Sequence, residues 1–302
     1  MEKVSVIIPT LNAQDTIGKL LEYLSKQNVD ILVIDSSSTD RTLEIVQEYE
    51  VEYMQITQNE FDHGTTRTLG AKHSQDAEFL IFLTQDALPY NSESIDNLLL
   101  PFKDDDVGAV CGRQIPHPNE AIFGRHLREY NYPQESHVRS YEDRKHYGIK
   151  TPFLSNSFAA YRRSALAQMG FFKEGLIFGE DMYMAAKMLQ SGYKVAYQAD
   201  AVVYHSHTYS YMQELRRYFD MGVFHTQEAW LLKDFGKAEG EGKKFVFSQI
   251  KFLLNNGKFY LIASMGLRTL FKLFGYKLGK NYQKLPKLLI LSLTMNAKWW
   301  KI

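Results

Sequence analysis

The sequence is poor in cysteine and lacks any long apolar run. Its single cysteine, Cys111, excludes an internal disulfide framework and favours a reducing compartment such as the cytoplasm. Because Cys111 lies in a short apolar segment, we expect it to be a small buried side chain. No apolar stretch approaches the ~20 residues that a membrane-spanning helix needs, so we do not expect an integral membrane protein.

The first residues show neither the pattern of a secretory signal nor a glycine-rich nucleotide loop. Residues 1–3 lead directly into an apolar strand, so we expect no signal peptide. A dinucleotide-binding fold would carry Gly-x-Gly-x-x-Gly after that strand, whereas residues 9–13 read Pro-Thr-Leu-Asn-Ala. A Walker Gly-x-x-x-x-Gly-Lys-Ser/Thr segment is also absent from the sequence. The sequence therefore excludes a standard NAD or ATP cradle.

Charge is balanced over the whole chain but not within it. From Lys233 onward the sequence carries 14 Lys or Arg against three acids, Asp234, Glu239 and Glu241. The final part thus has a surplus of 11 positive charges, and the residues before it carry the matching deficit. We expect the two parts to meet different partners.

Short apolar runs alternate with helical patterns over the first third of the chain. The run at 79–83 has five consecutive apolar residues, which indicates a strand buried on both faces. Runs at 4–8, 31–34 and 51–56 are similar, and a helical pattern follows each of them. This alternation predicts an α/β fold with a mostly parallel sheet and flanking helices.

The pattern is less regular further along. We predict strands at 107–111, 157–162, 193–198 and 201–204, the last two separated by a turn, and a helix at 180–190. The polar stretch 113–150 has weak periodicity, which is typical of a functional loop system or a small helical insertion. From residue 211 onward the chain is helical, so we divide it into an α/β domain at 1–210 and a helical, basic, amphipathic region at 211–302.

Acidic residues follow three of the predicted strands. Asp35, Asp62 and Asp86 stand at strand ends, and Pro9 and Thr10 end the first strand. The carboxyl ends of parallel strands share one edge, so these residues predict a concave site with acceptors for a base, a ribose and a metal. Taken alone, Asp86 is equally compatible with capping a helix that begins near residue 92 or with a turn before residue 89.

Four segments, in this order, resemble the motifs of family 2 inverting glycosyltransferases with the GT-A fold. They are VSVIIPTLN at 4–12, VIDSSSTDRT at 33–42, LTQD at 83–86 and GED at 179–181. Three further segments, at 61–67, 84–87 and 205–207, resemble the branch that transfers rhamnose from dTDP-rhamnose to bacterial surface polysaccharides. The resemblance covers about residues 1–210 and implies a GT-A-like, Rossmann-related sheet and inverting transfer of L-rhamnose.

The resemblance also implies roles for individual residues. Asp62 would accept a hydrogen bond from the pyrimidine imide, and Arg67 would neutralise phosphate or brace Asp86; the alternative for Arg67 is a surface arginine. The other nucleotide-binding candidates are Pro9, Thr10, Asn12, Asp35 and Gln85. Candidates for contact with the donor sugar or the acceptor are Arg113, Gln114, Ser155, Asn156 and Glu180.

The expected cofactor is a divalent cation, Mg²⁺ or Mn²⁺. The family usually has Asp-x-Asp where this chain has Thr84-Gln85-Asp86, so only the last acid is present. One carboxylate can suffice, because Mg²⁺ keeps waters and phosphate oxygens in its shell. His205 or His207 would complete the site, since imidazole suits Mn²⁺ better; alternatively, one of the pair is structural.

Asp181 is the candidate general base. Inversion at the sugar carbon requires attack by an acceptor hydroxyl, whose proton a carboxylate on the far face must accept. Without the resemblance, the favoured interpretation of Asp181 is a first-turn acid that stabilises the start of its helix; the order of the motifs reverses that preference.

The basic C-terminal region interleaves lysines with apolar residues and ends near Trp299 and Trp300. Such helices suit an anionic membrane surface, and a lipid-linked glycan acceptor would make a peripheral position at the cytoplasmic face useful. The alternative is that they pack on the catalytic domain with their lysines solvated. We expect no nucleic-acid partner, because no recognised binding module is present.

Three other functions compete with rhamnosyl transfer. The first is a GT-A transferase that uses a UDP-sugar. The second is a non-catalytic sugar-nucleotide-binding scaffold, motivated by Thr84 where the family has its first acid. The third is a nucleotidyltransferase, against which the absence of a glycine-rich, basic triphosphate loop argues.

Overall fold

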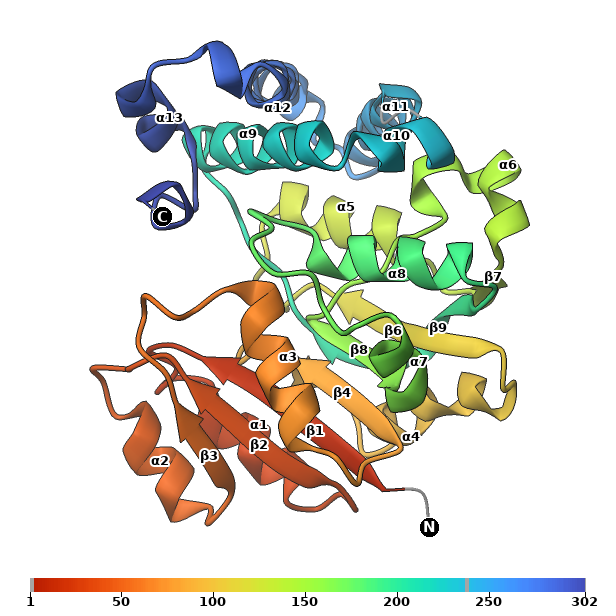
Figure 1. Ribbon diagram of the computed structural model, residues 1–302. Helices are drawn as coiled ribbons and strands as arrows, with labels where there is room; N and C mark the ends of the chain where they lie inside the picture. Colours follow the sequence, from red (N-terminus) through yellow and green to blue (C-terminus); the bar gives the residue numbers. More distant parts are fainter. Residues whose placement is uncertain (1–2, 237–238, 302) are drawn as a thin grey trace.

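A computed structural model describes residues 3–236 and 239–301. It shows a twisted sheet with helices on both faces and, at one end, a layer of C-terminal helices (Figure 1). The expectation that no signal peptide is present rests partly on Met1 and Glu2, which lie outside the described residues. Within the described residues, no helix is long and apolar enough to cross a membrane.

The first third of the chain confirms the predicted alternation of strands and helices. Its elements are β1 (Val4–Thr10), α1 (Ile17–Leu24), β2 (Asp30–Asp35), α2 (Thr42–Glu48), β3 (Glu52–Gln55), α3 (His63–His73), β4 (Phe79–Leu83), β5 (Leu88–Pro89), α4 (Ser94–Leu99) and the 3₁₀ turn η1 (Leu100–Lys103).

The middle of the chain adds the second half of the sheet and resolves the weakly patterned stretch into short helices. Its elements are β6 (Val107–Ile115), α5 (Ile122–Asn131), β7 (His137–Arg139), η2 (Tyr141–Asp143), α6 (Arg144–Tyr147), η3 (Gly148–Lys150), β8 (Phe158–Arg162), α7 (Arg163–Gln168), α8 (Glu180–Gln190) and β9 (Lys194–Tyr204).

The sheet runs in the order β3-β2-β1-β4-β8-β6-β9-β5, and β7 pairs with β9. Strands β3, β2, β1 and β4 are mutually parallel, and so are β6 and β9. Strand β8 is antiparallel to both β4 and β6, which makes β4 and β6 point the same way. The carboxyl ends of β1, β2, β4, β6 and β9 therefore lie along one edge of the sheet.

Two apolar clusters hold helices on the two faces of the sheet. Every side chain of β4 is buried, as its apolar run predicted. On one face, α1 buries Ile17, Leu20, Leu21 and Leu24 against β1 and β4. The cluster on the other face includes residues of α3, α7 and α8 together with Cys111, which is buried as expected.

One strand replaces the two that the sequence predicts at 193–198 and 201–204. Strand β9 is continuous, and the expected turn is instead a shift of register against β6 between Gly112 and Arg113. A Cβ on Gly112 would lie 2.6 Å from the Ala201 carbonyl oxygen, so the two backbones approach too closely for a side chain. The strand thus continues through an irregularity that glycine permits.

The C-terminal region is helical, as predicted, and its core is continuous with that of the sheet domain. Phe219, Val223 and Phe224 belong to the same apolar cluster as the residues of α8. The elements of this region are α9 (Tyr211–Gln227), α10 (Ala229–Phe235), α11 (Glu239–Asn255), η4 (Phe259–Leu261), α12 (Ile262–Lys280), η5 (Tyr282–Lys284), α13 (Lys287–Leu293) and η6 (Trp299–Lys301).

The terminal tryptophans pack on the body of the protein, which corrects their assignment to a membrane surface. Trp299 Nε1 donates to the Gly175 carbonyl at 3.0 Å. The Trp300 ring lies against Phe219 and Tyr282. The segment after α13 is turned back toward α9 by Asp220, whose carboxylate accepts hydrogen bonds from residues 294–296.

Candidate active site

Loops at the carboxyl edge of β1 and β2 form a tight hydrogen-bonded unit. Asp35 is fully buried and accepts from Thr10 Oγ1 at 3.1 Å and from the backbone N–H of Ser38 at 2.9 Å. Asn12 Oδ1 accepts from the Thr39 N–H at 2.9 Å. Pro9 precedes Thr10 in β1. These nucleotide-binding candidates therefore lie together, and Asp35 acts at least as the residue that joins the two loops.

Gln85 links the loop after β4 to the loop after β1. Its side-chain oxygen accepts from the Leu11 N–H at 2.8 Å, and its amide nitrogen donates to the Leu11 carbonyl at 3.1 Å. This pair of bonds holds the position next to Asp86 in a fixed place relative to the first loop.

Asp62 caps helix α3. Its Oδ1 accepts from the backbone N–H groups of Gly64 at 3.0 Å and Thr65 at 2.9 Å, and from the Thr65 hydroxyl. All hydrogen bonds described for this carboxylate fall on Oδ1. Capping satisfies free N–H groups at the helix start, and it leaves Oδ2 as the atom suited to a ligand.

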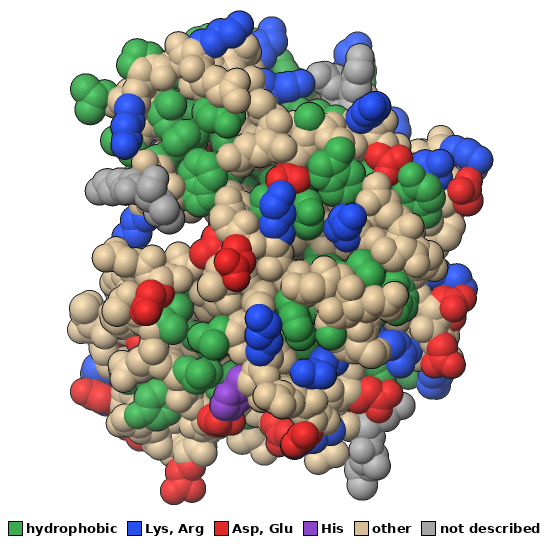
Figure 2. Space-filling model, in the orientation of Figure 1, with side chains coloured by type: hydrophobic (Ala, Val, Ile, Leu, Met, Phe, Trp, Pro, Cys, Tyr) green, Lys and Arg blue, Asp and Glu red, His purple; other side chains and the backbone are tan. Residues whose placement is uncertain are grey.

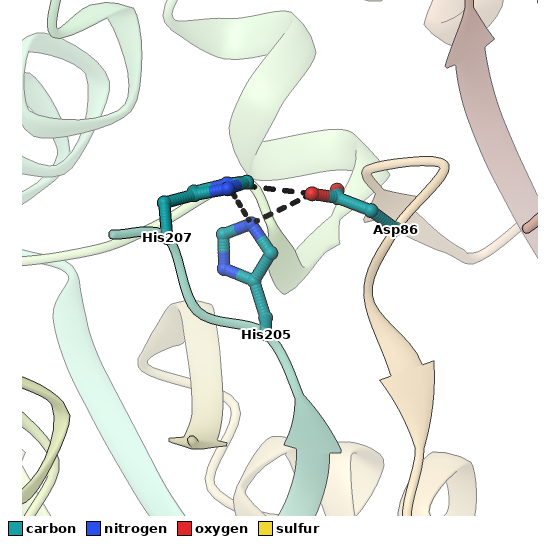
Figure 3. Close-up of side chains that lie close together, drawn as sticks. All are labelled: Asp86, His205 and His207. Carbon is teal, nitrogen blue, oxygen red and sulfur yellow. Dashed lines mark hydrogen bonds and ion pairs between the residues drawn. The ribbon is translucent and has the colours of Figure 1, made fainter. Parts of the chain in front are cut away.

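Asp86, His205 and His207 converge beyond the ends of β4 and β9 (Figure 3). Asp86 Oδ2 lies 3.3 Å from His207 Nε2 and 3.6 Å from His205 Nε2, and the two Nε2 atoms are 3.2 Å apart. Asp86 does not cap a helix, because α4 begins only at Ser94 and is flanked by Glu93. The three ligand atoms all lie within 4.8 Å of one another, which fits one divalent cation.

Both imidazoles of this cluster are neutral near pH 7. Burial lowers the pKa of His205 to about 3, against the opposing effect of Asp86. Burial likewise lowers the pKa of His207. Neutral imidazole is the form that binds a metal ion, so the short contacts to Asp86 are not ion pairs but a ready set of one oxygen and two nitrogen ligands.

Gln114 fixes the tautomer of His205. Its Oε1 lies 2.8 Å from His205 Nδ1 and accepts from Arg128 Nη1 at 2.6 Å, while its Nε2 donates to Ser155 Oγ at 3.0 Å. Since Oε1 is an acceptor, His205 carries its proton on Nδ1 and turns the lone pair of Nε2 toward Asp86 and His207. An outer hydrogen bond of this kind is the usual support of a metal-binding histidine.

Asp181 stands beside a second carboxylate at the start of α8. Its Oδ1 accepts from the Met182 N–H at 2.7 Å and its Oδ2 from the Asn156 N–H at 3.2 Å. Burial and the negative charge of Glu180 raise the pKa of Asp181 to about 7. The side chain is only partly buried, so it combines access with a raised proton affinity.

Arg67 is buried and pairs with Glu180, so its interpretation as a surface arginine is wrong. The side chain is 4% exposed, and Nη1 lies 3.0 Å from Glu180 Oε1. Asn156 Nδ2 also donates to that oxygen, at 3.1 Å. Burial alone would raise the pKa of Glu180, but Arg67, His63 and Asn156 hold it below its usual value. The described ion pair of Arg67 is with Glu180 rather than with Asp86.

A cavity of about 550 Å³ adjoins the cluster of Asp86, His205 and His207 on the side of β6 and β9. Gln114, which holds His205, forms part of its wall, and so do Arg113, Tyr132 and Tyr204. Among the described residues, Arg113 Nε has no hydrogen-bond partner although it is buried. The cavity therefore offers aromatic surface and an unpaired cation next to the cluster.

The structure brings most of the predicted site residues into three connected groups and adds others. Asn156 is bonded to both Asp181 and Glu180. Ser155, which precedes Asn156 in the chain, is bonded to Gln114, the residue that holds His205. Arg128 and Tyr161, whose hydroxyl donates to Asn156 Oδ1 at 2.7 Å, were not predicted. Arg128 lies in the weakly patterned stretch 113–150, and Tyr161 reads in the sequence as an ordinary strand residue.

Close relatives are found among bacterial polysaccharide enzymes. The chain is 45% identical to the O-antigen chain rhamnosyltransferase RfbN of Salmonella typhimurium, over 99% of this chain and 96% of the relative. It is 43% identical to the O-antigen chain rhamnosyltransferase WbaN of Salmonella anatum, over 99% and 96%. Both alignments run through the C-terminal helices as well as the sheet domain.

Solved structures with GT-A-type sheets share the fold. The mannosyltransferase PcManGT of Pyrobaculum calidifontis, in complex with GDP-Man and Mn²⁺, aligns with a TM-score of 0.58 and 19% identity over 99% of this chain and 88% of that one. TarS 1–349 of S. aureus, in complex with UDP-GlcNAc, aligns with a TM-score of 0.56 and 16% identity over 93% and 92%. Residues 5–170 match the family Glycosyl transferase family 2. The chain therefore belongs to glycosyl transferase family 2 and is a glycosyltransferase.

Proposed function

We propose that this enzyme transfers L-rhamnose from dTDP-rhamnose, with inversion, to a lipid-linked acceptor of a surface polysaccharide. The support for the sugar is the pair of relatives named as O-antigen rhamnosyltransferases, each similar over nearly the whole chain. The observation that carries the mechanism is Asp181, an accessible carboxylate with a pKa near 7 at the same sheet edge as the Asp86, His205 and His207 cluster.

The sheet order supports a linear arrangement of the substrates. The Thr10 and Asp35 loops follow β1 and β2, the cluster of Asp86, His205 and His207 follows β4 and β9, and the 550 Å³ cavity lies beyond β6. A nucleoside held by the first loops would place its diphosphate at the cluster and its sugar toward the cavity. We assign Asp62 Oδ2 to the pyrimidine imide N–H of the base, which has one donor at that edge.

The transfer step moves one proton to Asp181. The acceptor hydroxyl oxygen attacks the anomeric carbon of rhamnose, and the bond from that carbon to the phosphate oxygen breaks. The hydroxyl proton passes to the Asp181 carboxylate, and the nucleoside diphosphate leaves with the bonding electron pair. A base whose pKa lies near the working pH is well matched to this role.

Asp86, His205 and His207 would hold the divalent cation. Their atoms fit it because Gln114 aims the His205 lone pair into the cluster and because both imidazoles are neutral. When bound, Mg²⁺ or Mn²⁺ supplies charge that stabilises the leaving diphosphate. The missing first acid at Thr84 is thus compensated by two histidines.

The cavity is our candidate for the acceptor glycan. Tyr90 and Tyr204 offer aromatic rings whose centroids lie 5.6 Å apart, and Arg113 and Arg125 offer donors to sugar hydroxyls or phosphate. Gln114, Ser155 and Asn156 connect this cavity to His205 and Asp181, so an acceptor there would lie beside both groups.

A transfer assay tests the proposal. We expect the purified enzyme to move labelled rhamnose from dTDP-rhamnose to lipid extracts of a polysaccharide-producing strain, and to release dTDP. Asp181→Asn should lower the rate about 10²- to 10⁴-fold while donor binding is retained. Transfer from a UDP-sugar instead would leave the fold and base in place but overturn the donor. Undiminished turnover in Asp181→Asn would remove Asp181 as the base, and donor binding without turnover would favour a scaffold.

A further inference from the structure

Helix α12 has a second apolar face, which is exposed. Leu267, Leu270, Leu273 and Phe274 recur at spacings of three and four residues or lie side by side on that face. Their exposed fractions are 44%, 62%, 52% and 60%. The opposite side of the helix carries the buried glycines that pack on α9. A helix that is apolar on both sides normally has protein or lipid against both.

Exposed apolar side chains continue from α12 onto the neighbouring C-terminal elements. Figure 1 places α11 and α12 on the side of α9 and α10 away from the sheet, and α13 beside one end of α9. In Figure 2 the upper part of the molecule shows hydrophobic and Lys or Arg side chains over these helices. The additional residues, which with the four of α12 we call the tail surface, are Phe247, Leu254, Phe259, Tyr260, Leu288 and Leu289.

The tail surface includes the most exposed large apolar side chains of the described residues. Phe247 is 72% exposed, Phe259 68% and Leu288 84%. Contiguous apolar patches beyond a few hundred Å² are rare on soluble monomers and mark an interaction site. The exposed face of α12, with four apolar side chains at helical spacing, is the part of the tail surface that points to such a site.

Positive charge surrounds the tail surface. The sequence contains no acid after Glu241 and 12 Lys or Arg. Arg268 and Lys272 are paired with Glu214. After Glu241, the exposed lysines for which no ion pair is described within the described residues are Lys243, Lys251, Lys258, Lys277, Lys280, Lys284, Lys287 and Lys298.

The charge decides between lipid and a second copy of the chain. Two tail surfaces facing each other would oppose lysines with lysines, which costs free energy. An anionic bilayer supplies opposite charge to the lysines and an apolar layer to the leucines and phenylalanines. We infer that α11, η4, α12 and α13 dock this enzyme on an anionic membrane surface through the tail surface. The inference rests in part on the proposed function, since a lipid-linked acceptor requires such a location.

Helix α12 also contacts the loop that carries His207. Arg268 Nη1 donates to the Tyr209 carbonyl at 2.8 Å, two residues after His207. Arg268, His207 and Tyr209 line one small pocket. A membrane bound on the outer face of α12 would therefore lie one helix away from the loop that carries a metal ligand, where a lipid-linked acceptor is needed.

Vesicle binding of the full chain tests the inference. We expect the wild type to sediment with vesicles of equal parts phosphatidylglycerol and phosphatidylcholine at least about tenfold more strongly than with phosphatidylcholine alone, and less so at high salt. The double variant Leu270→Glu with Phe274→Glu should lose at least about tenfold of this affinity. Leu100→Glu, at a leucine 42% exposed outside the tail surface, is the matched control and should bind as the wild type does.

Two results would overturn the inference. One is equal binding of the wild type to both kinds of vesicle, or unchanged binding by the double variant. The other is a dimer in sedimentation velocity that the double variant abolishes without any vesicle binding, which would identify a second copy as the occupant. Calorimetric binding of dTDP-rhamnose separates this test from the proposed function. Its loss in a wild type that still binds vesicles would remove only the donor assignment.

Discussion

Two neighbouring carboxylates at the start of α8 have pKa values that are shifted in opposite directions. Glu180 keeps a low pKa because Arg67 and Asn156 are bonded to it, whereas Asp181 has its pKa raised by burial and by that same Glu180. The two acids that the sequence shows side by side thus divide their work. Glu180 is held ionised by its partners, and Asp181 is left able to take up a proton near neutral pH.

The rate should follow the ionisation of Asp181. Because its pKa is about 7, the ionised base is lost as the pH falls through 7, so we expect kcat/KM to fall about tenfold per pH unit below that point. Glu180→Gln removes one cause of the raised pKa and should shift this acid limb to lower pH. Glu174→Gln, at an exposed glutamate, serves as the control. An acid limb that Glu180→Gln leaves in place would contradict the assignment.

The raised pKa of Asp181 should also make the folding stability depend on pH. The folded pKa of Asp181 lies above the ordinary value, so the protonated form favours folding below about pH 4, and this contribution is lost as the pH rises to about 7. Asp181→Asn mimics the protonated acid. We expect it to raise the Tm by a few degrees above pH 7 and to change it little near pH 4, as measured by thermal unfolding at both pH values. A lower Tm at pH 8 would contradict the raised pKa.

Loss of the Gln114 side-chain amide should lower the affinity for the metal ion strongly. Gln114→Leu keeps the volume but removes the acceptor of the His205 Nδ1 proton, so the ring loses its fixed tautomer. We expect Mn²⁺ affinity in the presence of dTDP to fall about 10- to 100-fold by calorimetry. Ser155→Ala removes a partner of Gln114 without touching His205 and should have a smaller effect. Equal Mn²⁺ affinity in Gln114→Leu and wild type would contradict this role.

Single residues were predictable from the sequence only where a strand end places them. Asp86 ends a strand that its own apolar run defines, and His205 and His207 end another, so their meeting at one sheet edge was expected. Gln114, which was expected to face the sugar or acceptor, lines the cavity, and its amide is also bonded to His205, Arg128 and Ser155. That arrangement depends on where α5 packs, and α5 lies in a stretch without clear periodicity.

Helix α3 is capped by Asp62, the residue that we propose to bind the base of the donor nucleotide. Asp62→Ser retains an N-cap oxygen, whereas Asp62→Ala removes it. We expect Asp62→Ala to lose about 1 kcal/mol of stability in chemical denaturation and Asp62→Ser to lose little. Both variants should weaken dTDP binding, because neither retains a carboxylate. Full dTDP affinity in Asp62→Ser would show that Asp62 serves the helix alone.

Glycines allow α12 to lie against α9. A Cβ on Gly275 would collide with the Leu215 carbonyl, whereas one on Gly266, in the same helix, would meet no atom within 4 Å. We expect Gly275→Ala to destabilise the protein by about 1–3 kcal/mol through overpacking. Gly266→Ala should be neutral or stabilise by up to about 1 kcal/mol from helix propensity. Equal effects of the two substitutions on chemical denaturation would contradict this close packing.

Helices and strands with a clear hydrophobic periodicity were predicted well from the sequence. Those whose form depends on tertiary contacts were not. The four strands and three helices before residue 86 follow the apolar pattern directly. The polar centre of β9 resembles a turn, so the sequence predicts two strands there; the pairing with β6 and the close backbone at Gly112 show one continuous strand. The exposed face of α12 is visible in the sequence as an apolar stripe, but which stripe packs on α9 depends on the glycines.

The whole molecule arranges its functions across the sheet. The loops after β1 and β2, the Asp86, His205 and His207 cluster, the Asp181 pair and the cavity follow one another along the carboxyl edge, and the basic helices cover one end. The boundary predicted at residue 210 separates the charges, while the apolar core crosses it through Phe219 and Phe224. We therefore expect the two regions to unfold together.

The donor and the metal dependence are best measured together, by calorimetry on the full chain. The ligands are dTDP-rhamnose, UDP-glucose and UDP-N-acetylglucosamine, each with Mn²⁺, with Mg²⁺ and with a chelator. We expect dTDP-rhamnose alone to bind tightly, and the chelator or His205→Ala to weaken this binding. Preference for a UDP-sugar would contradict the proposed donor. Binding of dTDP-rhamnose that neither the chelator nor His205→Ala alters would contradict the proposed metal site.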